Sequence, residues 1–238
     1  MAHNSINAHK VGTFQEYLKQ IVYGGNDGIV TTFAIVAGFA GAGAEGAAQV
    51  GGVAVLLFGI ANLLADATAM GLGEFLSARS QQDVYNATRE KELAAISANP
   101  DTETSEILAI LADRNVGSED ANEFAEIMRR NPEFMTDFTM HYLVGMQDPS
   151  GSSAGMNGLF TFLSFIALGS VPLLPYFLLE PLQSTFYLSI GATIAALISL
   201  GLLRWRVTNE LLLRCVGETV LVGGICAIVA FGVGLMFR

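Results

Sequence analysis

Residues 53–76 read VAVLLFGIANLLADATAMGLGEFL, an apolar stretch interrupted by one amide and two carboxylates. A helix crosses a hydrocarbon core of about 30 Å with about 20 residues, so this stretch is long enough to span a membrane. A charge at the centre of a bilayer costs on the order of 3 kcal/mol, and such residues usually face a protein interior or a transport pathway. Asp66 is therefore a candidate functional residue inside a predicted membrane helix.

Four possible metal ligands of this stretch follow one another at intervals of four, in the order Asn62, Asp66, Met70 and Glu74. On a helix this spacing places them along one face. Carboxylate oxygen together with thioether sulfur suits a first-row transition metal better than Mg²⁺ or Ca²⁺. The stretch therefore predicts a path for metal ions, although Met70 can also be a core-packing residue and Glu74 an acid at the membrane interface.

Asp27 is a further carboxylate next to an apolar run, because residues 28–42 read GIVTTFAIVAGFAGA. An acidic residue in this position either lines a pathway or caps the start of a helix beside Gly28. The same run contains Gly24-x3-Gly28 and Gly38-x3-Ala42, which are patterns that let helices approach closely. We expect this first span to form a contact between two copies of the chain.

The composition indicates a membrane protein throughout. Hydrophobic residues make up 52% of the chain and charged residues 14%, and the mean hydropathy is +0.48. A soluble domain of this size needs more polar surface. The sequence predicts an all-α polytopic membrane protein with five transmembrane helices, near residues 21–43, 50–76, 156–179, 184–203 and 215–237.

The basic residues predict the orientation of these spans. All of them except Arg238 lie before the first span, between the second and third, or between the fourth and fifth. Because cytoplasmic loops carry the excess of Lys and Arg, we expect the N-terminus on the cytoplasmic side and the C-terminus outside or in a lumen. Residues 1–20 are polar, lack the apolar region of a signal peptide, and are predicted to be a cytoplasmic amphipathic lead.

Residues 77–155 form the only long polar segment, between the second and third spans, and carry most of the net charge of −10. Asn99-Pro100 and Asn131-Pro132 each pair an N-cap residue with a proline at the first helical position. We expect span 2 to continue to about Ser97 and three short helices to follow, with Gly117 ending one of them. The predicted domains are thus 1–20, the spans in 21–76, the acidic helical insert 77–155, and the spans in 156–238.

The insert also carries candidate metal ligands. Glu92 ends its first helix, Glu103 and Glu106 are three residues apart on the second, and Met140 lies on the last. A helical bundle can gather these side chains around divalent cations, with carboxylates as hard ligands and methionine as a soft one. The alternative is an ordinary solvated acidic face.

Four motifs resemble the vacuolar iron transporter family. These are NDGIVTTFAIVAG at residues 26–38, MGLGEFLS at 70–77, PDTE at 100–103 and VPLLPY at 171–176, and their order and spacing agree from about residue 20 onward. The resemblance implies a homodimer that exchanges cytosolic Fe²⁺, and often Mn²⁺, for protons. It implies a transported metal rather than a cofactor, and no enzyme activity; we expect no nucleic-acid partner.

The resemblance also implies roles for particular residues. Asp27 and Met70 match the translocation site, whereas Glu92, Glu103, Glu106 and Met140 match the domain that collects metal. Departures from the plant pattern are Ala95, Leu143 and Gln147, each in place of a glutamate, Asn62 in place of another, and Asp66 where small residues are common. We therefore expect a weaker collecting site and an intramembrane site extended toward Asp66.

The sequence leads to the hypothesis that Asp27 and Met70 bind one divalent cation during export from the cytosol. Asp66 and Asn62 would lie further along the path, and Glu74 would receive ions from the insert. Two alternatives stay open at this point: a metal-sensing membrane protein, and a channel without proton coupling. We expect a bacterial inner membrane, or a vacuolar membrane in a eukaryote.

Overall fold

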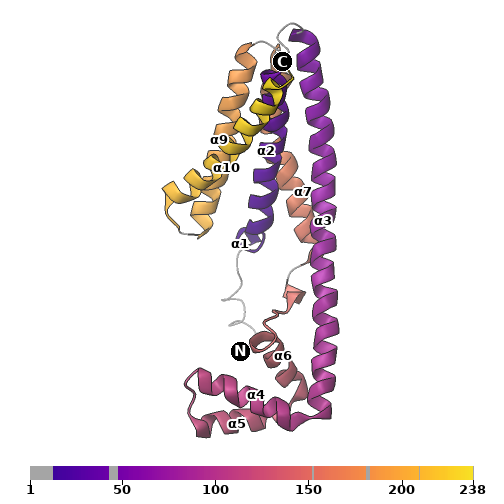
Figure 1. Ribbon diagram of the computed structural model, residues 1–238, viewed down its shortest axis with the longest axis vertical. Coiled ribbons are helices and arrows are strands. Elements are labelled where there is room, and N and C mark those ends of the chain that lie inside the picture. The colour runs from indigo at the N-terminus through magenta and orange to yellow at the C-terminus, as the bar shows by residue number, and fades with distance from the viewer. Residues whose placement is uncertain (1–12, 43–47, 152, 181–182, 209, 238) are drawn as a thin grey trace, which may run out of the picture. The chain divides into compact units, whose positions relative to one another are not determined.

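A computed structural model describes residues 13–42, 48–151, 153–180, 183–208 and 210–237, and within these ranges the regular structure is helical (Figure 1). The chain divides into two compact units. Unit 1 comprises residues 1–75 and 154–238, and unit 2 comprises residues 76–153. The prediction of an all-helical chain is confirmed.

Unit 1 contains the apolar helices. They are α1 (Thr13–Glu16), α2 (Leu18–Gly41), the first part of α3 (Ala48–Ala98), α7 (Ala154–Gly169), η5 (Val171–Leu173), α8 (Leu174–Leu178), α9 (Gln183–Thr208) and α10 (Leu212–Leu235). Among the residues that the structure describes, four stretches are long and apolar enough to cross a membrane: 52–98, 154–178, 184–208 and 212–235. The prediction of several membrane-spanning helices is confirmed, and α2, the predicted first span, is not among these four.

The predicted third span, 156–179, is not one continuous helix. It consists of α7 up to Gly169, the 3-10 turn η5 and the short helix α8. Pro172 lies in η5 and Pro175 in the first turn of α8. Proline has no backbone N–H and clashes with the preceding turn, so a regular α-helix cannot continue through this segment.

Helix α2 is enclosed by other helices of unit 1. It packs against α7, α9 and α10. Ile29 and Val36 are fully buried, and Phe33 is nearly so. Because the core residues of α2 belong to two different clusters, one with Val55 and Leu173 and one with residues of α9, this helix holds the unit together.

Glycines let α2 approach α7 backbone to backbone. A Cβ atom placed on Gly28 would lie 2.5 Å from the carbonyl oxygen of Phe165, and one on Gly24 would lie 2.6 Å from that of Thr161. The small residues that predicted a contact between two chains are thus used, at Gly24 and Gly28, for packing within one chain.

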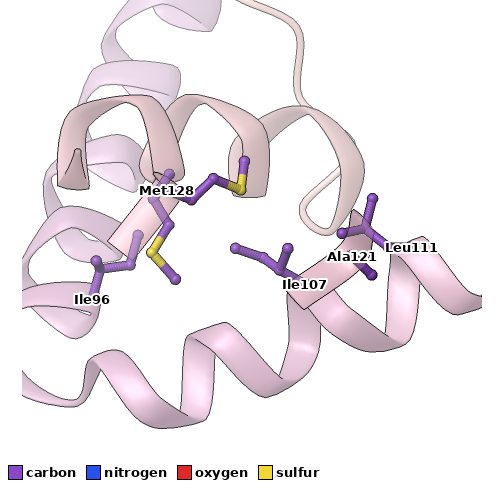
Figure 2. Packing of buried hydrophobic residues seen from close by; sticks show 6 residues of the cluster. Ile96, Ile107, Leu111, Ala121 and Met128 are labelled. Carbon is purple, nitrogen blue, oxygen red and sulfur yellow. The ribbon is translucent and has the colours of Figure 1, made fainter. Parts of the chain in front are cut away.

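Unit 2 consists of the end of α3, α4 (Pro100–Asp113), α5 (Ser118–Arg129), α6 (Pro132–Tyr142) and η4 (Pro149–Gly151). Its core joins Ile96 of α3, Ile107 of α4 and Met128 of α5, as Figure 2 shows. Arg89 of α3 forms ion pairs with Glu133 and Asp137 of α6. These ion pairs connect the side chains of α6 to α3.

The predicted helix boundaries in this unit are largely confirmed. Helix α3 ends at Ala98, and Asn99 and Asn131 are the N-cap residues of α4 and α6, each followed by proline. The prediction for Gly117 was wrong, because this residue is the N-cap of α5 rather than the end of α4. The turn after α4 is made by Asn115, whose φ is 60°, a left-handed conformation that asparagine tolerates better than most residues.

The tight α2–α7 contact gives a test of the fold. Gly28→Ala is expected to lower the free energy of unfolding by about 1–3 kcal/mol, because the added methyl group overlaps a backbone oxygen that cannot move alone. Gly38→Ala in the same helix is the matched control, since its Cβ would meet its nearest neighbour at 3.9 Å. Thermal unfolding of the full chain in detergent measures both; equal melting temperatures for the two variants would contradict this packing.

Candidate metal-ion path

Helix α3 carries four candidate residues on one face. It is continuous through this region, so the spacing of four places Asn62, Asp66, Met70 and Glu74 in one row. All four are partly buried. They border a row of buried residues that includes Leu63, so they lie at the edge of the packed surface of α3.

One acid of this row, Asp66, lies near the acid of α2, Asp27. The side chains of Asp27 and Asp66 are close enough to interact electrostatically. The Nδ2 atom of Asn62 donates a hydrogen bond of 2.7 Å to Oδ2 of Asp66. Such a pair of like charges in a partly buried position is stabilised by a bound cation or a shared proton.

Asp27 does not cap the start of a helix. Helix α2 begins at Leu18, more than two turns earlier, so the alternative that Asp27 is an N-cap residue was wrong. The hydroxyl of Thr31 donates to the backbone carbonyl of Asp27 rather than to its side chain. The Asp27 carboxylate is therefore a mid-helix acid, next to the close approach at Gly28.

Met70 packs in an apolar cluster. Its neighbours include Ala67 of α3 and the fully buried Phe165 of α7. The backbone of Phe165 also touches Gly28, the residue after Asp27. Phe165 thus connects the surroundings of Asp27 and Met70, and the packing role of Met70 is observed directly.

Glu74 is joined to α2 by a residue that the sequence did not single out. Nε2 of Gln20 donates a hydrogen bond of 3.0 Å to Oε1 of Glu74. Gln20 is only 7% exposed. The signal that could have revealed it is its position seven residues before Asp27, which is two turns along the same face of α2.

Unit 2 brings three of the predicted ligands into one electrostatic neighbourhood. Burial raises the pKa of Glu103 above its ordinary value, and the charges of Glu106 and Glu92 raise it further. Glu103 is partly buried and Glu106 is exposed on α4. The charges of these three carboxylates therefore repel one another, and a nearby positive charge would relieve that repulsion.

The fourth predicted ligand of this unit, Met140, is fully buried in α6. Among the described residues, no three His, Cys, Asp or Glu side chains are arranged closely enough to hold a metal ion. Ala95, Leu143 and Gln147, which stand where the plant pattern has glutamates, are exposed. These three side chains therefore do not form part of the buried core of unit 2.

Comparison with known proteins identifies one family. The model of the VIT family matches residues 18–235. The chain belongs to the VIT family. It is 32% identical over 220 residues to vacuolar iron transporter 1 of Oryza sativa subsp. japonica, covering 92% of this chain and 85% of the relative.

Two further relatives of this VIT-family chain come from distant organisms. Vacuolar iron transporter 1 of Arabidopsis thaliana is 32% identical over 219 residues, with 92% of this chain and 85% of the relative covered. The vacuolar iron transporter of Plasmodium berghei is 32% identical over 233 residues, with 94% and 83% covered. The VIT-family protein is a membrane protein and a transporter, not an enzyme, and iron is a transported substrate in this family rather than a cofactor.

The raised pKa of Glu103 makes the stability of this VIT-family protein depend on pH. A carboxyl group whose folded pKa exceeds its unfolded pKa stabilises the fold when protonated, and this contribution is lost as pH rises through the folded pKa. Glu103→Gln is therefore expected to make α4 more stable than in the wild type at pH 7, with the difference vanishing as pH falls below the ordinary glutamate range. Hydrogen exchange of the α4 amides, with chelator present, measures this difference. A variant less stable at pH 7 would contradict the assignment, and Glu119→Gln, on α5, is the control.

Proposed function

We propose that this protein exports divalent transition metal ions, Fe²⁺ and also Mn²⁺, from the cytosol in exchange for protons. The observation that carries the proposal is that two helices of an apolar bundle carry acids near enough for their charges to interact, Asp27 and Asp66, the second of which accepts a hydrogen bond from Asn62. Two acids in such a bundle are costly unless they serve an ion. Family membership supports iron as the substrate.

We propose α2 as a fifth membrane span. Its 24 residues are long enough to cross a bilayer, and it is packed by α7, α9 and α10, of which parts belong to spanning stretches. Asn26 and Asp27 lower its hydropathy. A helix enclosed by other spans tolerates polar residues that a lipid-exposed helix does not.

The four candidate residues on α3 set the length of the proposed path. From Asn62 to Glu74 the helix rises about 18 Å, more than half of a hydrocarbon core. In this path Asp27 and Met70 bind the ion, Asp66 and Asn62 continue the row, and Glu74 receives ions from the cytoplasmic side. The mixture of oxygen and sulfur favours transition metals over Mg²⁺ and Ca²⁺.

Proton exchange follows from the same carboxylates. A metal ion and a proton compete for the same oxygens of Asp27 and Asp66, so the arrival of one displaces the other. A path built from backbone carbonyl groups alone would lack this competition. Antiport therefore needs no further titratable group in the membrane.

Unit 2 is the proposed cytoplasmic collecting domain. Glu92, Glu103 and Glu106 attract cations by their combined charge, with Met140 as a softer ligand if α6 moves its buried side chain toward them. The exposed positions of Ala95, Leu143 and Gln147 lack the glutamates of plant relatives. We propose that this domain holds fewer ions than theirs.

A homodimer through the first span completes the proposal. The side of α2 that is not buried carries Tyr23, Asp27, Val30 and Ala34, at spacings of four, three and four residues. This row is continuous along the helix and contains the acid of the proposed site. A second copy packed here would enclose Asp27. We propose a bacterial inner membrane, or a vacuolar membrane in a eukaryote, with the N-terminus in the cytoplasm.

The proposal is tested by anaerobic uptake of Fe²⁺ into proteoliposomes, with lumenal pH recorded at the same time. Metal entry coupled to proton exit is expected. Metal entry without proton movement would indicate a channel, and binding without entry would indicate a sensor; either result contradicts antiport.

Two variants assign the flux to the site. Asp27→Asn is expected to reduce Fe²⁺ uptake at least tenfold, because a neutral amide cannot compensate the charge of the ion. Met70→Leu keeps the volume that the Phe165 cluster requires and removes only the sulfur, so uptake is expected to fall while the melting temperature stays nearly unchanged. Met156→Leu, on α7, is the matched control. Undiminished uptake in Asp27→Asn would exclude this site.

A further inference from the structure

The hydrogen bond between Gln20 and Glu74 leaves one buried oxygen without a partner. Oε1 of Gln20 has no hydrogen-bond partner among the described residues, although the residue is only 7% exposed. A buried acceptor in this state costs about 1–3 kcal/mol. Such a group in a native structure calls for an explanation, and a bound water or ion that completes it is one.

The orientation of the amide follows from its neighbour. An ionised carboxylate can only accept hydrogen bonds, so the Nε2 end of Gln20 must face Glu74. The Oε1 atom is then the free end of the amide. Glu74 is only partly buried, and Oε2 has no hydrogen bond to any described residue, so this oxygen is also available.

The surrounding packing holds Gln20 in place. Ser164 of α7 donates from Oγ to the backbone carbonyl of Gln20 at 3.3 Å. One turn before, Tyr17 stacks on Phe160 of α7 with 4.4 Å between ring centroids. One turn after, Gly24 lies against the backbone of Thr161. The amide is therefore carried by a fixed part of α2 rather than by a frayed helix end.

We propose that Gln20 Oε1 and the Glu74 carboxylate form a subsite for a divalent cation, ahead of the site at Asp27 and Met70. This inference rests on the proposed transport function and adds Gln20 to its path. In the sequence Glu74 is the member of the α3 row nearest the polar segment, two residues before unit 2 begins, and we therefore assign the subsite to the cytoplasmic end of the proposed path.

The chemistry of the subsite differs from that of the deeper one. A neutral amide oxygen and a carboxylate oxygen are both hard ligands, which suit Mn²⁺ and Fe²⁺ better than soft ions. The thioether of Met70 adds a soft ligand only further along. The metal ion is thus selected in two steps. Oxygen ligands select it at Gln20 and Glu74, and oxygen together with sulfur selects it at Asp27 and Met70.

The decisive variant is Gln20→Leu, tested by Mn²⁺ uptake into proteoliposomes with the full chain. Leucine is apolar and of similar size, so replacing the unpaired amide at a buried position is expected to leave the melting temperature unchanged or raised. The KM for Mn²⁺ is expected to rise about tenfold while the maximal rate is nearly kept, because the first ligand is lost and the deeper site is intact. Gln81→Leu makes the same chemical change at an exposed position of α3 and is the matched control.

A second variant separates ion binding from mere packing. Gln20→Glu combined with Glu74→Gln keeps one amide and one carboxylate and exchanges their places. The KM of this double variant is expected to return to within about threefold of the wild type, whereas each single change alone raises it. Gln20→Met supplies sulfur in place of oxygen and is expected to shift the preference from Mn²⁺ toward Cd²⁺.

The outcomes distinguish this inference from the proposed function. Wild-type uptake with an unchanged KM in Gln20→Leu overturns the subsite, leaves transport intact and means that water completes Oε1. Absence of uptake by the wild type overturns the proposed function. In that case equilibrium dialysis of Mn²⁺ with the full chain in detergent decides: Gln20→Leu binding one ion fewer supports the subsite, and equal binding overturns it.

Discussion

The close approach of α2 to α7 is the contact on which the rest of unit 1 depends. At Gly24 and Gly28 the two backbones come nearer than any side chain would allow. This contact fixes the depth of α2 in the bundle and therefore the positions of Gln20, one turn before it, and of Asp27, which lies between the two glycines. Both side chains interact with α3, at Glu74 and Asp66 respectively.

The polar contacts between α2 and α3 have a common character. Each pairs a group of α2 with a carboxylate on the face of α3 that carries Met70. Each pair carries net negative charge inside an apolar bundle whenever its carboxylates are ionised. A metal ion or proton compensates that charge, and a path with two such positions lets the ion move from one to the next without losing all its ligands.

Much of the fold follows from local sequence signals. The apolar runs predict the spanning helices, and Asn99-Pro100 and Asn131-Pro132 predict the starts of α4 and α6, because a cap residue followed by proline acts within one turn. The role of Gly117 was misjudged because Asn115 supplies the left-handed turn that glycine usually makes. The predicted third span extended to residue 179, whereas α7 ends at Gly169, just before Pro172 and Pro175, at which a helix is expected to end.

The candidate site residues that the sequence predicts are recognised by their charge, by their spacing of four residues or by resemblance to the family. Asp27, Asp66 and Glu74 stand out because they interrupt apolar runs. Gln20 does not, since a single glutamine near the start of a helix is common, and its importance depends on the position of Glu74, 54 residues away. The packing of Met70 against Phe165 likewise depends on which helices are neighbours, and the sequence alone does not determine this.

The central claim is that one Fe²⁺ binds between Asp27 and Met70. X-ray absorption at the iron edge, on the full chain loaded anaerobically with Fe²⁺, tests it most directly when Met140→Leu has removed the thioether of unit 2. The account predicts a sulfur neighbour of the iron that disappears when Met70→Leu is added. A coordination shell of oxygen and nitrogen alone in Met140→Leu, or a sulfur signal that survives the loss of Met70, would contradict it.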